Sequence, residues 1–220
     1  MKRLNRIIAL LALLLVSTST FAQWRFGINV AYENTGANWE LDGKTKGINN
    51  ISGFSVGPTV AYEAVDNYFD IQSGLSFAMN GFSAQDQSIF GNNHFLNEEE
   101  LVRLYYLQLP VYAVGKLPVK EATLVLEAGP IFAAGVGGKA VTTYKSEGVS
   151  RTEEKEDVFE HGLSRFNCLI HFGIGAEYQG AKLTVGYNLG VFDMVEDGHI
   201  RSDLTTDGFF VSIGYVFDFD

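Results

Sequence analysis

An apolar side chain stands at every second position in eight segments of this chain, and this period of two constrains the fold more than any other feature. In the first segment the apolar residues run from Trp24 to Tyr32, and the residues between them are small or polar. Such alternation places neighbouring side chains on opposite faces of a β-strand. No segment of comparable length has the apolar spacing of a helix. The sequence therefore predicts an all-β fold, with strands at 24–33, 54–63, 69–79, 105–112, 124–132, 168–178, 182–191 and 210–219.

The connections between these segments alternate in length. They are long at 34–50, 83–100, 139–162 and 192–208, and short at 64–67, 115–121 and 179–181. An up-and-down antiparallel barrel of the outer membrane has this arrangement, because its periplasmic turns are short and its outer loops are longer. A soluble sandwich or a lipocalin-like barrel also has alternating strands, but its apolar face points inward and its loop lengths need not alternate.

Hydrophobic residues make up 46% of the 220 residues, yet the longest uninterrupted apolar run is Ile7–Val16. A helix needs roughly 20 residues to cross a bilayer, so this run is too short. The apolar face of the eight segments is rich in Phe, Leu, Val and Ile, whereas the other face suits the side-chain-filled interior of a small barrel. We therefore predict an eight-stranded antiparallel up-and-down transmembrane β-barrel in the outer membrane. Its interfacial aromatic girdle is expected to contain Trp24, Tyr62, Phe69, Tyr178 and Phe219.

The first 22 residues have the pattern of a secretory signal peptide. Three basic residues precede the apolar run Ile7–Val16, and small residues lead to a cleavage site between Ala22 and Gln23. The barrel domain is then predicted to be 23–220. Cleavage removes three basic residues and no acidic one, which changes the net charge from −10 to −13. Such an acidic chain is a poor ligand for nucleic acid, whose phosphates require Lys and Arg.

Three short motifs resemble those of a known family. They are Leu104–Lys116 (LYYLQLPVYAVGK), Phe172–Tyr178 (FGIGAEY) and the closing Gly214–Phe219 (GYVFDF), and they resemble the PorT-like outer membrane β-barrel family of Bacteroidota. The resemblance implies an outer-membrane barrel of the porin family, and a minority of members act in protein secretion or gliding through the type IX system. The last strand ends in Phe219 followed by Asp220, a small departure from the terminal aromatic residue that the barrel-assembly machinery recognises. We expect that machinery to be a partner during insertion.

Ionisable and amide side chains on the polar face predict a network inside the barrel. Buried charges persist when they are paired or hydrogen-bonded. If the first strand rises from the periplasm, most of these residues lie toward the periplasmic end, and Arg25 and Lys182 are expected to bridge several carboxylates there. The alternative is a proton or ion path, although an eight-stranded lumen is normally filled. The predicted lumen network consists of Arg25, Glu63, Asp70, Gln108, Glu127, His171, Glu177, Lys182 and Asp218.

Two acidic runs, Glu98–Glu100 and Glu153–Asp157, fall in predicted outer loops. Carboxylate clusters can hold Ca²⁺ or Mg²⁺. Neither run has the spaced ligands and turn glycine of a calcium loop, so we predict no metal site and interpret both runs as solvated surface. An alternative interpretation is contact with the divalent cations that bridge lipopolysaccharide.

The same loops contain histidines that could serve an enzyme, but nothing in their spacing selects a catalytic set. We predict no catalytic site and no cofactor. The lone Cys168 is expected to face lipid as a small apolar group. The candidate residues are His94, His161 and His199, with Ser88, Asp193, Asp197 and Ser202.

These observations lead to three functional hypotheses. The first is a structural or interaction barrel at the cell surface with a filled lumen, whose partners are outer-membrane lipid and lipopolysaccharide. Its secretion-linked version needs a partner among the secretion-system proteins. The second is a small-solute porin or channel, and the third is a lipid-modifying enzyme that works through its surface loops.

Overall fold

The computed structural model describes residues 23–41, 44–85, 98–146, 149–195 and 202–217. Among these residues, no helix is both long and apolar enough to cross a membrane. The strands are β1 (Trp24–Leu41), β2 (Lys44–Gly47), β3 (Asn49–Val65), β4 (Phe69–Gly74), β5 (Ser76–Gln85), β6 (Glu98–Val119), β7 (Ala122–Ser146), β8 (Val149–Glu156), β9 (Phe166–Tyr178), β10 (Ala181–Gly190) and β11 (Ser202–Phe217), and the 3₁₀ helix η2 covers Val158–His161.

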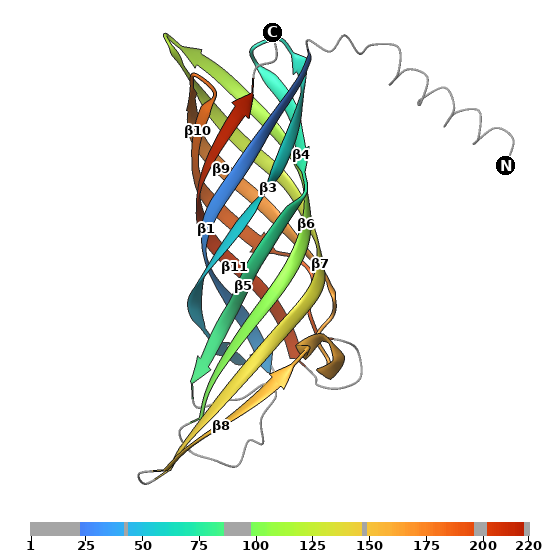
Figure 1. Ribbon diagram of the computed structural model, residues 1–220, viewed down its shortest axis with the longest axis vertical. Coiled ribbons are helices and arrows are strands. Elements are labelled where there is room, and N and C mark those ends of the chain that lie inside the picture. Colours follow the sequence, from blue (N-terminus) through green and yellow to red (C-terminus); the bar gives the residue numbers. More distant parts are fainter. Residues whose placement is uncertain (1–22, 42–43, 86–97, 147–148, 196–201, 218–220) are drawn as a thin grey trace, which may run out of the picture.

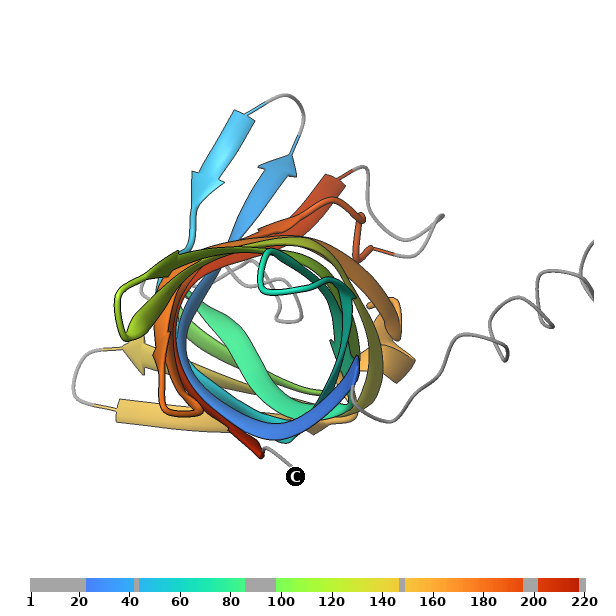
Figure 2. The same ribbon diagram turned by 90° about the horizontal axis from the view of Figure 1, so that it is seen from above.

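The strands form one closed antiparallel ring, which Figure 1 shows from the side and Figure 2 along its axis. β4 and β5 are two parts of one wall strand, interrupted only at Leu75, and both pair with β3 and β6. The ring therefore has eight positions, in the order β1, β3, β4 with β5, β6, β7, β9, β10 and β11. Pairing of β11 with β1 closes it. The predicted eight-stranded up-and-down topology is confirmed.

The register of the ring fixes its width. A path through directly opposed residues starts at Trp24, goes once around the ring and returns to β1 at Asn34, ten residues further along the strand. Eight strands with this stagger make a narrow barrel whose strands tilt by about 40° and whose interior is filled by side chains. The residues on this path are Trp24, Tyr62, Ile71, Ala113, Ala128, Phe172, Tyr187, Phe209 and Asn34.

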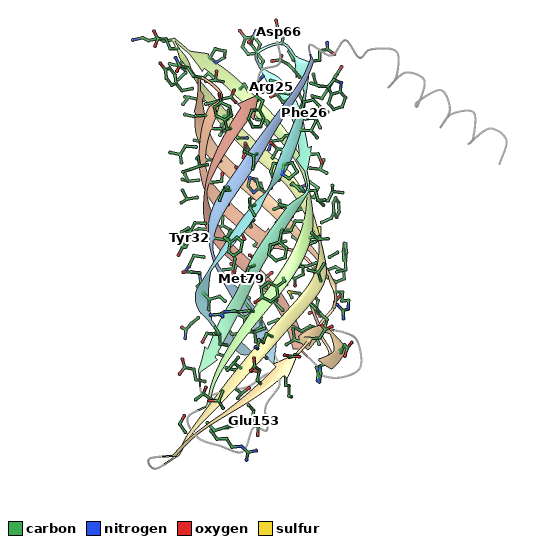
Figure 3. The ribbon with its side chains drawn as sticks, viewed as in Figure 1. Arg25, Phe26, Tyr32, Asp66, Met79 and Glu153 are labelled. Carbon is green, nitrogen blue, oxygen red and sulfur yellow. The ribbon has the colours of Figure 1, made fainter. Side chains whose placement is uncertain are left out.

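The outer wall is apolar and exposed, whereas the inner wall is buried. Leu126 is 61% exposed and Ile213 is 65% exposed, although both lie in the middle of paired strands. A soluble sandwich or lipocalin-like barrel would bury such residues, so the outward apolar face requires a lipid environment. Figure 3 shows this wall with its side chains, and Phe26 and Tyr32 both belong to it.

Aromatic residues border the apolar belt at both ends. From Trp24 to Tyr32, β1 crosses the belt in nine residues, close to the roughly 9–11 that a tilted strand needs. The predicted girdle residues Trp24, Tyr62 and Tyr178 lie at one border, where the Trp24 and Tyr62 rings are 5.1 Å apart. Phe69 is half-buried beside them, and Phe219 lies outside the described residues. The opposite border was not predicted, and its members are Tyr32, Phe54, Phe77, Tyr105 and Phe209.

Three short turns lie at one end of the barrel, which we call the turn end, and the longer connections lie at the loop end. The turns are 66–68, 120–121 and 179–180. Gln179 and Gly180 both have positive φ, at 50° and 80°, as expected for the two-residue turn that matches the twist of a hairpin. Because short turns are periplasmic in outer-membrane barrels, the turn end faces the periplasm and the loop end faces outward.

The predicted loop boundaries were wrong at the loop end. The interval 34–50 contains the end of β1, all of β2 and the start of β3, and 139–162 contains the hairpin of β7 with β8. That hairpin projects beyond the ring at the bottom of Figure 1. Where strands extend past the filled part of the barrel, both of their faces meet water, so the ladder of backbone hydrogen bonds continues while the sequence alternation disappears. The acidic run Glu98–Glu100 therefore begins β6 instead of lying in a loop. The run Glu153–Asp157 lies mainly in β8.

Candidate functional site

Side chains fill the lumen in three layers of different chemistry. Along β6, the inward residues change from the cation Lys116 at the turn end, through Tyr112 and Gln108, to the buried apolar residues Leu104 and Val102 toward the loop end. We call these the charged layer, the polar layer and the apolar layer. One strand thus runs through all three, and the alternation of its side chains decides which residues enter each layer.

The charged layer is a network of two cations and three carboxylates. Arg25 contacts Asp70 and donates from Nη1 to Glu177 Oε1 at 3.1 Å. The Nζ atom of Lys116 lies 2.7 Å from Glu63 Oε1 and 2.7 Å from Asp70 Oδ1. Asp70 is 1% exposed, so the two cations supply its charge compensation. Arg25 lies near the turn end in Figure 3, where Asp66 marks the adjacent turn.

The polar layer begins with a buried ion pair. Lys182 Nζ donates to Glu127 Oε1 at 2.6 Å and to Gln72 Oε1 at 2.8 Å. Glu127 is 5% exposed and Lys182 is 8% exposed. Lys182 and Glu127 belong to β10 and β7, which flank β9, whereas Gln72 belongs to β4 on the opposite side of the ring, so the bond from Lys182 to Gln72 crosses the lumen.

His171 occupies the centre of the polar layer. Its ring is stacked between Tyr112 and Phe210, with centroid distances of 4.1 Å and 4.5 Å. Its Nδ1 lies 2.8 Å from Asn188 Oδ1, and its Nε2 lies 3.5 Å from Glu127 Oε2. Both ring nitrogens therefore face acceptor oxygens, and the two aromatic faces prevent the ring from turning. The imidazole joins opposite walls of the barrel.

A cavity of about 50 Å³ remains within the polar layer, enough for a few water molecules. Glu33 and Glu127 both line it, as do Gln108 and Asn29. Glu33 is 4% exposed, and the side-chain amide of Asn80 can donate to it at 2.7 Å. The Oδ1 atom of Asn29 is buried without a protein partner, which fits a site where water completes the hydrogen bonding.

The apolar layer closes the lumen toward the loop end. Val158 and Phe159 of η2 are buried against the inward side of β7, at glycines that leave room for them. A Cβ atom at Gly135 would collide with the Phe159 ring, and one at Gly138 would collide with the Val158 side chain. The layer contains Ala37, Phe82, Val102, Leu104, Tyr106, Ala133, Ala140, Val158, Phe159, Leu163, Met194 and Leu204.

Comparison with known proteins agrees with this architecture. Residues 17–196 match the family described as outer membrane protein beta-barrel domain. The chain belongs to this family. It is therefore an integral protein of the outer membrane, in agreement with its closed ring and its apolar outer wall.

Solved structures similar to this outer-membrane barrel share little sequence with it. Ail of Yersinia pestis is 15% identical, covers 89% of this chain and 99% of its own, and has a TM-score of 0.42. A major outer membrane protein of Thermus thermophilus is 10% identical, with 88% and 99% coverage and a TM-score of 0.46. OprG of Pseudomonas aeruginosa is 12% identical, with 89% and 95% coverage and a TM-score of 0.38. No curated protein sequence matches the chain.

The outer-membrane barrel places eight of the nine predicted network residues in its lumen, and Asp218 lies outside the described residues. Arg25, Glu63, Asp70 and Glu177 meet in the charged layer. The prediction for Lys182 was wrong in detail, because its amine reaches Glu127 and Gln72 in the polar layer instead of bridging carboxylates at the turn end. Gln108 and His171 also belong to the polar layer, where Gln108 accepts from Ser76 at 3.4 Å.

Sequence reasoning missed several lumen residues. Lys116 was not predicted to enter the lumen because the interval 115–121 was interpreted as a turn, whereas β6 continues to Val119. Glu33 lies at the end of the first predicted strand, on its polar face, and this position could have identified it as a lumen residue. Gln72 and Asn188 were on polar faces too, but uncharged residues gave no reason to single them out.

Two of the candidate loop residues have backbone hydrogen-bond partners in the described part of the chain. His161 Nδ1 lies 3.2 Å from the Asp157 carbonyl oxygen, and Asp193 Oδ1 accepts from the backbone N–H groups of Val195 and Leu204. Within the described part of the chain, no three His, Cys, Asp or Glu side chains are placed to hold a metal. Ser202 begins β11, and His94, His199, Ser88 and Asp197 lie outside the described residues.

Proposed function

We propose that this outer-membrane barrel does not conduct, and that it has a structural or interaction role at the cell surface. The apolar layer is the observation that carries this proposal. An ion that crosses the lumen must leave water to pass between buried apolar side chains such as Phe82, Leu104 and Phe159, which are 0–5% exposed. Removing a charge from water without a partner is costly.

The lumen then serves as the rigid interior of an anchor. Its buried charges hold opposite walls together, and the projecting hairpin of β7 and β8 supplies surface for contacts outside the membrane (Figure 1). Exposed ion pairs cover this hairpin, including Arg151 with Glu153 at 3.1 Å. A polar surface of this kind suits reversible contacts with lipopolysaccharide or surface proteins, and no catalytic role is proposed for it.

A link to type IX secretion is the most specific role that the PorT-like resemblance implies. It requires a periplasmic or membrane partner, and the described turns of two or three residues offer such a partner little surface. Deleting the gene and then measuring secreted and surface-attached proteins tests this role. An unchanged secretome would remove it.

Small-solute transport is the second candidate, and the cavity of about 50 Å³ is the observation that favours it. The cavity lies between the charged layer and the apolar layer, so transport requires both of them to open. The decisive experiment is single-channel recording from purified protein in planar bilayers. We expect no stable currents, and large persistent currents would overturn the proposal.

Mass spectrometry of lipid A with and without the protein tests the enzyme hypothesis, for which we expect no modification.

A further inference from the structure

Two cations stand directly opposite each other on the outer wall near the loop end. Arg103 of β6 and Lys139 of β7 are cross-strand partners. Both point outward, because their strand neighbours Val102, Leu104 and Ala140 are buried in the lumen, with exposed fractions of 0–1%. Like charges in directly opposed positions of an antiparallel pair are destabilising. The pairing of β6 with β7 alone therefore does not account for two cations here.

The pair lies immediately beyond the aromatic border of the apolar belt. Tyr105 lies two residues from Arg103 on β6, which is one outward position closer to the membrane. The rings of Phe54, Phe77 and Tyr105 form a continuous ledge there, with centroid distances of 6.3 Å and 6.2 Å between neighbours. The cations consequently lie at the height of lipid headgroups of the outer leaflet, and an apolar surface runs below them.

The described carboxylates next to this pair lie on the side of Lys139. Lys139 contacts Glu154, and Glu156 is its cross-strand partner on β8. Among the residues that the structure describes, no carboxylate lies within 4.0 Å of the Arg103 guanidinium. On the other side of Arg103 the opposed residue is Gly81, and the side chain of Ile51 lies over it. An exposed ion pair such as Lys139 with Glu154 is weak and exchangeable.

We propose that Arg103 and Lys139 bind the phosphorylated headgroup of an outer-leaflet glycolipid, whose acyl chains lie on the ledge of Phe54, Phe77 and Tyr105. A guanidinium can bind a phosphate through two parallel hydrogen bonds, and the neighbouring ammonium adds a third charge-assisted contact. The phosphate also relieves the repulsion between the two cations. This site depends on the outer-membrane location and adds a defined lipid partner to the proposed surface role.

Lipid retention by the purified protein tests the site. The full-length barrel is refolded in detergent, incubated with phosphorylated lipid A, and examined by native mass spectrometry. We expect wild type to retain lipid A and the double variant Arg103→Gln with Lys139→Gln to bind it at least about tenfold more weakly, because both cations that contact the phosphate are lost. Lipid A from which the phosphates have been removed is expected to bind wild type as weakly.

The matched control is Arg151→Gln with Lys120→Gln, which removes the same charge from the projecting hairpin and from a turn. It should retain lipid A like wild type. Equal retention by wild type and the Arg103/Lys139 variant would overturn the proposal, and so would equal loss in the control. Displacement of lipid A by an equal concentration of inorganic phosphate would also overturn it, because the site would then be a general anion site. Bilayer recordings of the same samples separate this result from the non-conducting proposal, which concerns the lumen alone.

Discussion

At the residue scale, the charged layer depends on a few buried ions that neutralise each other. Arg25, Glu63, Asp70 and Glu177 could be predicted from the sequence, because each lies on the polar face of a strand with clear alternation. Lys116 could not, because the sequence around it has no alternation that extends β6 past Gly115. Yet Lys116 joins Glu63 to Asp70, and it is 9% exposed. A cation that connects two carboxylates of the layer thus lay in a segment interpreted as a turn.

Replacing Lys116 by Met should destabilise the barrel by about 3 kcal/mol. The change leaves Asp70 buried with one cation instead of two, and removing one partner from a buried ion network is more costly than the loss of a surface hydrogen bond. The midpoint of urea unfolding in lipid vesicles measures the effect. Lys120→Met is the control, because Lys120 is exposed in the adjacent turn and its loss should change the free energy of unfolding by less than about 0.5 kcal/mol. Equal effects of the two variants would contradict the role of the ion network.

At the element scale, the sequence predicted which face of each strand is inward but not how far the strands extend. Within the belt, one face of each strand meets lipid and the other meets the lumen, so apolar and polar side chains must alternate along the strand. Outside the belt this constraint disappears, and the hairpins of β1 with β2 and β7 with β8 are formed by polar sequences without alternation. The apolar layer was missed for a related reason: Val158, Phe159 and Met194 belong to irregular segments whose packing depends on tertiary contacts.

An outward residue in the belt should not tolerate charge. Ile174 is 58% exposed in β9, and Ile174→Arg should cost about 3 kcal/mol of folding stability in a bilayer, because the guanidinium enters hydrocarbon. Thr205→Arg is the control, since Thr205 lies on β11 beyond the Phe209 border. Urea unfolding in vesicles of defined thickness measures both. A smaller cost for Ile174→Arg than for Thr205→Arg would contradict the assignment of the lipid-facing wall.

The η2 segment should contribute to stability through Phe159. This ring is 5% exposed, packs edge-on against Tyr106 at 5.8 Å and lies 5.3 Å from the Arg165 guanidinium. Phe159→Ala should therefore lower the free energy of unfolding by about 3 kcal/mol, as for other buried aromatic residues. The lipid-facing Phe166, which is 45% exposed, provides Phe166→Ala as a comparison with a smaller expected loss. If both variants unfolded at the same urea concentration, the apolar layer would not be a packed core.

At the scale of the whole molecule, closure of the ring should be visible in solution. Pairing of β1 with β11 leaves no free sheet edge within the membrane, where unpaired backbone groups are costly. The folded barrel should therefore stay compact in cold detergent and migrate differently on a gel before and after boiling. Identical migration of boiled and unboiled samples would count against a closed barrel. Point variants of the outer wall that still fold should keep the shift.

The seam between β1 and β11 has a further consequence for chain connectivity. Phe26 and Phe217 are opposed across it, so the two ends of the described chain are neighbours in space. Each position in the ring has two partners, and the seam is bonded like every other interface. A chain that starts at a different strand could therefore form the same closed sheet. A circular permutant that begins at Glu121, ends at Lys120 and joins the original ends by a short linker would preserve every cross-strand pair.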